Sequence, residues 1–384
     1  MKYWRGYLVA AIIAACSWGL VQFAQSHWAL VDMVYPYVSR LIQNFMADWS
    51  AGVSYCVWQM GILVLIAGVL ASVVMMILWK WNVIQWLGWV LAVVSVVLLL
   101  NTGLYGLNAY AGPLAADIRL DVTDYTVSEL QDAARFYQGK ANDLAKKVGR
   151  DSQGQPEFAE FSQLAEQAAD GFETLTYDRF YSIFAGTTVP VKELGWSDRF
   201  TRKGITGIHC GITGEAAVNT QTPDVGLPFA ICRQMAMRVC IANKQDASFA
   251  AFLACTANTS AEFQYSGYFM AYRYCYDALN TMQIKSAQAA AASLKKNENS
   301  YLAADVERYN ASFAVGSDYA YAEASEPAAD GEDTQNTPVR SSVADLLTSW
   351  HIQQYVLPLM EEEEVMFDPM DENQVDLSGI VNAK

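Results

Sequence analysis

The sequence is short of the residues from which hydrolytic sites are commonly built. It has three histidines in 384 residues, and a serine or cysteine hydrolase needs a histidine beside its nucleophile. Its seven cysteines include no Cys-x-x-Cys pair, which argues against a zinc knuckle and gives a poor disulfide framework. A Gly-x-Ser-x-Gly elbow, a phosphate-binding loop and a dinucleotide fingerprint are also missing. These common routes to catalysis are therefore not expected.

Charge is scarce in the first 112 residues. This part contains four basic and two acidic side chains, a net charge of +2, so the whole-chain net charge of −15 leaves −17 for residues 113–384. A strongly acidic second part argues against nucleic acid and anionic lipid as its partners.

Three apolar runs occupy the first part instead, at residues 7–24, 55–79 and 83–107. Each is close to the roughly 20 residues that cross a bilayer as a helix. The sequence therefore predicts an α-helical membrane region with three transmembrane helices over residues 1–112. The link at residues 25–51 contains Trp28, Tyr35, Tyr37 and Trp49. Such rings favour the headgroup layer, so we expect the link to lie along the membrane.

The few charges indicate an orientation. Lys2 and Arg5 precede the first run and Lys80 separates the last two, which favours a cytoplasmic N-terminus and an extracytoplasmic C-terminal region. A lipoprotein signal ending at Cys16, with that cysteine acylated, is the alternative. Because the apolar run continues past Cys16, a retained span is the preferred interpretation.

The remaining residues predict a mainly α, α+β domain with a small sheet at residues 113–322, completed by a helix at 341–360. A capping box at 128–131 predicts a helix to about residue 147, and a second helix is expected at 158–172. β-prone segments punctuated by glycines at 187–227 predict the sheet. Further helices are expected from residue 228, at 247–255, along a stripe of tyrosines at 265–276, and at 286–313. Residues 323–340 read as a flexible acidic insertion and 361–384 as an acidic tail.

The helix that opens at Pro228 invites comparison with a zinc-binding helix. A His-Glu-x-x-His pattern presents two imidazoles on one helix face to a zinc ion, with the glutamate beside the bound water as general base. The equivalent positions here are Arg233, Gln234 and Met237. Taken alone, this segment predicts an ordinary buried helix.

The segments around this helix add a family resemblance. They are residues 214–220, 227–229, 232–237, 246–255 and 263–268, together with 34–36, 39–41, 101–110 and 190–192. Their order resembles the bacterial domain-of-unknown-function family 3810 (DUF3810). The resemblance implies a membrane protein whose extracytoplasmic domain has a zincin-like, metallopeptidase-type fold.

The resemblance also implies what the chain has lost. The family pattern has His, Glu and His where this chain has Arg233, Gln234 and Met237, and its acidic third ligand falls on Asp246. A guanidinium cannot bind zinc, a carboxamide cannot take a proton from water, and a thioether is a weak zinc ligand. The expectation is a catalytically inactive homologue without the zinc of active relatives, which binds a peptide or protein partner in the former substrate cleft.

Candidate cleft residues are Glu215, Asn219, His209 and Tyr265. One alternative is a metal-dependent hydrolase with a rebuilt site around Asp246, Glu215 and His209, joined by Cys232 or Cys240. Another is a structural membrane protein that assembles with itself. A further hypothesis is that Arg233 pairs with Asp246 and fills the vacant metal position.

Overall fold

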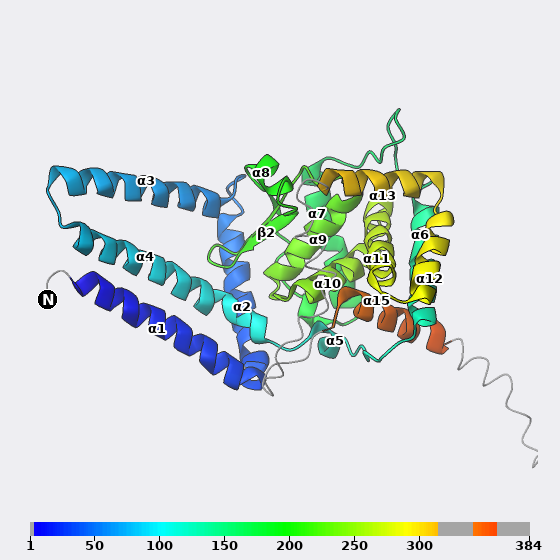
Figure 1. The fold of residues 1–384 in the computed structure, drawn as a ribbon, viewed down its shortest axis with the longest axis horizontal. Coiled ribbons are helices and arrows are strands. Elements are labelled where there is room, and N and C mark those ends of the chain that lie inside the picture. Colours follow the sequence, from blue (N-terminus) through cyan, green and yellow to red (C-terminus); the bar gives the residue numbers. More distant parts are fainter. Residues whose placement is uncertain (1–3, 314–340, 359–384) are drawn as a thin grey trace, which may run out of the picture.

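The computed structural model describes residues 4–313 and 341–358 (Figure 1). The expected acidic insertion at 323–340 and the acidic tail at 361–384 lie outside the described residues. The described part consists of a membrane region, a crossing helix and a helical domain with a small sheet.

Three helices are long and apolar enough to cross a membrane, as predicted. They are α1 (Arg5–Ser26), α3 (Val57–Leu78) and α4 (Val83–Leu104). Helices α1 and α4 pack closely, since a Cβ at Gly6 would lie 2.6 Å from the carbonyl carbon of Gly88. Helix α3 stands apart from α1 (Figure 1), and none of its apolar stretch is buried in the described chain.

The link predicted to lie along the membrane is one long helix, α2 (Trp28–Ser50). It runs across the direction of α1, α3 and α4 (Figure 1). Its buried face includes Ser39, Gln43 and Ala47. Its exposed apolar residues recur at helical spacing: Leu30, Met33, Val34, Tyr37, Val38, Leu41, Phe45 and Trp49. This two-faced pattern is typical of a helix that lies in a membrane interface.

The domain that follows is built from helices packed around one apolar core. Its helices are α5 (Leu114–Asp117), α6 (Val127–Leu144), α7 (Phe161–Glu173), α8 (Ser197–Thr201), α9 (Leu227–Arg238), α10 (Lys244–Ala257), α11 (Ala261–Thr281), α12 (Lys285–Lys296), α13 (Ser300–Phe313) and α15 (Val343–His351). Short 3₁₀ and π turns join them: η2 (Gly106–Tyr110), η3 (Thr174–Asp178), η4 (Ser182–Phe184), η5 (Asp224–Gly226) and η6 (Ile352–Val356). The tyrosine stripe lies on α11, where Tyr265 and Tyr272 are fully buried in the core.

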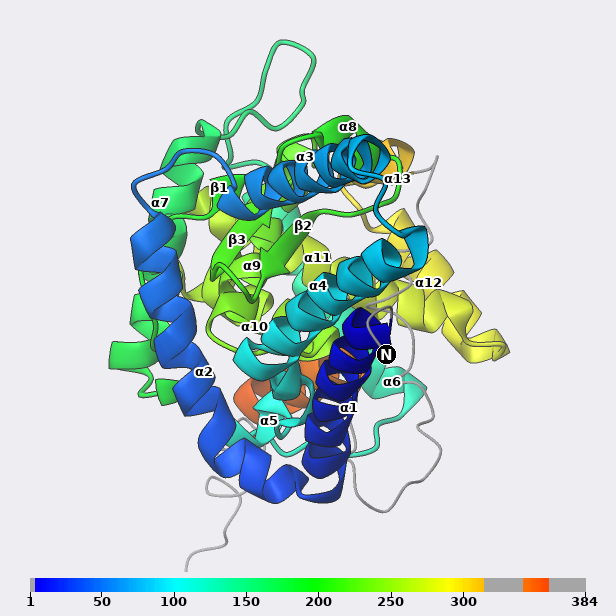
Figure 2. The same cartoon turned by 90° about the vertical axis from the view of Figure 1, so that its left-hand side faces the viewer.

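The predicted small sheet has three strands in the order β1-β3-β2. Strand β1 (Lys192–Glu193) runs parallel to β3 (Glu215–Val218), and β2 (Gly207–Cys210) runs antiparallel to it. Figure 2 shows the strands and α9 between α2, α3 and α4, so the sheet lies where the domain meets the membrane region.

Two predicted helix boundaries were wrong. The capping box is formed by Thr126 with Glu129, two residues before the predicted start at Ser128, because only Thr126 has the glutamate three positions later. The single helix expected at 286–313 is two helices, α12 and α13. The break falls at Asn299, whose amide groups bond to Asn142 of α6 instead of continuing a helix.

Candidate functional site

Helix α9 lies at the centre of the candidate site and is buried along most of its length. Pro228 occupies its first turn, where a missing amide proton does no harm. Ser266 of α11 accepts a hydrogen bond from the Phe229 amide at 3.0 Å. Next to it, Gly267 lets α10 approach, since a Cβ there would lie 2.7 Å from the Cys255 Cβ. Ser266 is thus a helix-packing residue rather than a nucleophile.

The three positions of the altered zinc motif have separate surroundings. The Nε of Arg233 donates to the Ser248 Oγ at 3.1 Å. Gln234 is fully buried, and neither its amide nitrogen nor its amide oxygen has a hydrogen-bond partner. Met237 is half-buried, and its backbone carbonyl accepts a hydrogen bond from the Tyr105 hydroxyl at 2.9 Å.

Gln234 lies against strand β2 of the sheet, whereas Arg238, one turn further along α9, donates to the Thr187 carbonyl. Gly207 of β2 makes room for Gln234, since a Cβ at Gly207 would lie 2.6 Å from the Gln234 Cγ. His209, two residues further along β2, packs against Tyr105, with ring centroids 4.6 Å apart and the ring planes tilted by 59°. Neither ring nitrogen of His209 has a hydrogen-bond partner. Burial, and then the charge of Arg238, lower the His209 pKa to about 3, so the imidazole is neutral.

Glu215 holds the membrane region to the sheet. Its two carboxylate oxygens accept the amide protons of Val57 and Trp58, at 2.8 and 2.9 Å, at the N-terminus of α3. Lys192 donates to the same carboxylate at 2.6 Å. All these oxygens are engaged in a structural contact, which leaves little capacity for the metal-ligand role considered above.

Asp246 lies in a different place, at the first turn of α10. It lines a cavity of about 190 Å³ together with Asp32, Arg40, Asp117 and Cys240. Arg233 does not form the hypothesised ion pair with Asp246, since its guanidinium bonds to Ser248 and no ion pair joins the two among the residues described.

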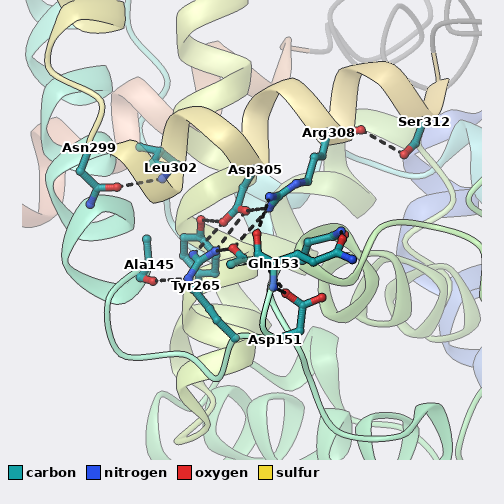
Figure 3. A network of polar contacts seen from close by, with 12 residues as sticks. Ala145, Asp151, Gln153, Tyr265, Asn299, Leu302, Asp305, Arg308 and Ser312 are labelled. Carbon is teal, nitrogen blue, oxygen red and sulfur yellow. Dashed lines mark hydrogen bonds and ion pairs between the residues drawn. The ribbon is translucent and has the colours of Figure 1, made fainter.

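Asn219 and Tyr265 are also held in structural contacts. The Asn219 amide nitrogen donates to the Thr201 hydroxyl at 2.7 Å and to the Ile205 carbonyl at 3.1 Å, which fixes the turn before β2. The Tyr265 hydroxyl donates to Asp305 of α13 at 2.6 Å (Figure 3). Asp305 also forms ion pairs with Arg150 at 2.8 Å and with Arg308 at 3.3 Å.

The candidate cleft residues are therefore not brought together. His209 packs against Tyr105 at the end of α4, Glu215 faces α3, Asp246 faces α2, and Tyr265 faces α13. Across residues 4–313 and 341–358, no group of three or more His, Cys, Asp or Glu side chains has the arrangement of a metal site. The rebuilt metal site around Asp246, Glu215 and His209 does not form in this geometry.

Comparison with known proteins agrees with the pattern of segments around α9. A family model for DUF3810, a protein of unknown function, matches residues 31–328. The chain belongs to the DUF3810 family. The match includes α2, α3, α4 and the domain through α13. No curated protein and no solved structure matches the chain.

Three residues of this DUF3810 chain make contacts at the site and were not among the candidate site residues predicted from the sequence. Tyr105 follows the last span and covers His209, Lys192 pairs with Glu215, and Arg238 ends α9. Lys192 and Arg238 each stand beside buried apolar residues (Val191 and Val239). A charged residue beside apolar ones in the sequence could have indicated that Lys192 and Arg238 are buried, but only the fold shows which residues they contact.

Proposed function

We propose that this chain is a membrane-anchored, non-catalytic member of the DUF3810 family, a homologue of a zinc metallopeptidase that binds a peptide or protein partner beside α9. The observation that carries the proposal is Gln234. It stands where the family resemblance expects the general base, and it is buried under β2 with both amide atoms unpartnered.

The donor set beside α9 does not fit a zinc ion. Zinc in proteins takes thiolate, imidazole or carboxylate ligands, whereas the positions expected to supply them are a guanidinium, a carboxamide and a thioether. Arg233 also places a permanent positive charge there, which repels a cation. A carboxamide at Gln234 cannot remove a proton from water.

Zinc stoichiometry of the full-length protein in detergent tests the non-catalytic part. The wild type should retain no stoichiometric zinc after loading and desalting. A variant that restores the family residues, Arg233→His with Gln234→Glu and Met237→His, should retain about one zinc ion if α9 and Asp246 keep the arrangement of a zincin site. Adding Asp246→Ala to that variant is the matched control and should weaken retention.

Two results would overturn this proposal. Stoichiometric zinc on the wild type, removed by Asp246→Ala, would restore the metal-dependent hydrolase. A restored variant that folds, by circular dichroism and thermal unfolding, but retains no zinc would remove the relation to metallopeptidases.

Partner binding is tested separately with a photo-crosslinking amino acid at position 233, which is half-buried beside α9. A discrete adduct in cells is expected there, and none is expected from the same probe at the exposed position 199. Equal labelling at both positions, or none at 233, would contradict the binding role.

We also propose that the N-terminus is cytoplasmic and that the domain after α4 is extracytoplasmic in a bacterial cell membrane. The basic residues near the N-terminus and the odd number of candidate spans among the described residues support this orientation. A membrane-impermeant reagent should label a cysteine introduced at Gly139, on an exposed face of α6, in intact cells. Labelling only after cell lysis would reverse the orientation.

A further inference from the structure

Arg238 is a buried cation without an anionic partner. It is the last residue of α9 and only 1% exposed. One guanidinium nitrogen, Nη2, donates to the Thr187 carbonyl at 3.2 Å, whereas Nε has no partner. No ion pair reaches it from the residues that the structure describes.

The electrostatics of Arg238 show that its charge is poorly compensated. Burial lowers the Arg238 pKa to about 10, and the charge of the Asp48 carboxylate offsets only part of that effect. The Asp48 carboxylate is itself engaged by the Thr187 hydroxyl at 2.7 Å. With a pKa near 10 the guanidinium is still cationic at neutral pH, and a buried unpaired charge is unfavourable unless something pairs with it.

Arg238 lines a small cavity that opens to solvent. The cavity has a volume of about 50 Å³ and lies between α9, the end of α7 and residues 184–188. Thr176, Thr187 and Thr188 bring hydroxyl groups to its wall. A cavity needs about 10–15 Å³ of such space to hold one water molecule, so this one has room for a small polar group.

We propose that this cavity binds a carboxylate group, which pairs with Arg238. A carboxylate offers two oxygens to the planar guanidinium, and such charge-assisted contacts are among the strongest hydrogen bonds in proteins. The Thr188 hydroxyl can donate to the same oxygens, whereas the hydroxyls of Thr176 and Thr187 already donate to the Phe172 carbonyl and the Asp48 carboxylate. In a peptide ligand the group would be an acidic side chain or the C-terminus.

Glu173 is the competing occupant of this site. Glu173 lines the cavity and is exposed. Its carboxylate therefore either repels an incoming anion, or turns inward and pairs with Arg238 itself. These two cases predict opposite effects of Glu173→Gln, which makes the proposal testable. This proposal does not depend on the loss of the zinc motif, because zinc retention and carboxylate binding are measured in separate experiments.

The experiment uses the full chain in detergent, with acetate as the probe. Acetate replaces chloride at constant ionic strength and pH 7.5, and thermal unfolding is followed for the wild type, Arg238→Met, Glu173→Gln and the exposed-arginine control Arg199→Met. The wild type and Arg199→Met should show a rise in Tm that saturates with acetate. Arg238→Met should show none, and Glu173→Gln should reach half its rise at a several-fold lower acetate concentration.

Equal acetate responses in the wild type and Arg238→Met would overturn the proposal. So would a Glu173→Gln variant that is destabilised while the wild type ignores acetate, because Glu173 would then be the partner of Arg238. If Arg238→Met does not fold, equilibrium dialysis of labelled acetate against the wild type and Glu173→Gln decides the matter. About one bound equivalent, held tighter by Glu173→Gln, is expected, and no saturable binding would reject the site.

Discussion

Lys192 and Glu215 form a buried ion pair, with 2.6 Å between the Nζ and Oε1 atoms, and the same carboxylate caps the N-terminus of α3. Lys192 also donates to the carbonyls of Ser50 and Tyr55 on either side of the turn between α2 and α3. Two neighbouring strands of the sheet thereby hold the point where the chain enters the second membrane span.

Breaking this ion pair should destabilise the protein strongly. Glu215→Gln leaves the Lys192 ammonium buried without an anion, and removing one partner of a buried pair typically costs about 3–5 kcal/mol. Thermal unfolding in detergent should show the loss, with faster proteolysis between residues 51 and 56. Replacing both residues, Glu215→Gln with Lys192→Met, should recover part of the stability. A double variant as unstable as Glu215→Gln would contradict the pairing.

His209 should make stability sensitive to acid. Its folded-state pKa is lowered to about 3, below the ordinary value near 6.5 of the unfolded chain. Between these values only the unfolded state binds the proton, so stability is complete above about pH 6.5 and is lost as the pH falls. The expected slope is about 1.4 kcal/mol per pH unit below pH 6. His209→Phe, which keeps a ring on Tyr105, should flatten the slope between pH 6.5 and 5; an unchanged slope would contradict this assignment.

Two buried glutamines provide a matched test of the site. Gln234 has no hydrogen-bond partner for either amide atom, whereas the Gln43 amide donates to the Leu104 carbonyl at 3.2 Å and the Gly211 carbonyl at 2.9 Å. Gln234→Met should therefore raise the free energy of unfolding, by about 1–2 kcal/mol, because an unsatisfied polar group is removed. Gln43→Met should lower it by about 1–3 kcal/mol. Chemical denaturation measures both, and a loss of stability in Gln234→Met would point to a bound polar ligand.

The Asp305 network should respond in proportion to burial. Tyr265→Phe removes a 2.6 Å hydrogen bond to a fully buried carboxylate, and bonds to charged groups contribute about 1.5–3 kcal/mol. Arg308→Met removes a longer contact, 3.3 Å, from a side chain that is 35% exposed, and such pairs contribute about 0–1 kcal/mol. Equal destabilisation by the two substitutions would contradict this dependence on burial.

Much of the fold follows from local patterns. Uncharged runs of span length, apolar residues at helical spacing and glycine-punctuated β-prone segments predicted the membrane helices, α6, α9 to α11 and the sheet. The errors concerned where individual helices begin and end. Thr126 and Ser128 are both good capping residues, and only the position of Glu129 relative to each decides between them. The break at Asn299 depends on Asn142, a partner 157 positions away in the chain.

The site was harder to predict because its geometry depends on partners that are distant in sequence. Chemical type directed attention to Glu215, His209 and Asp246, but type alone does not say which way a side chain points. Glu215 turns to the first amides of α3, and Asp246 turns toward α2. Only the fold shows that Lys192 forms an ion pair, whereas Arg238 donates to a backbone carbonyl.

The cap of α3 can form only late in the synthesis of this protein. Glu215 is 158 positions beyond Val57, so at ~5–20 residues per second the ribosome supplies this carboxylate roughly 8 to 30 s after the amide that it caps. During that interval the first turn of a membrane helix relies on water or lipid headgroups for its amide protons. The N-terminus of α3 is thus capped late, by the domain that follows it in the chain.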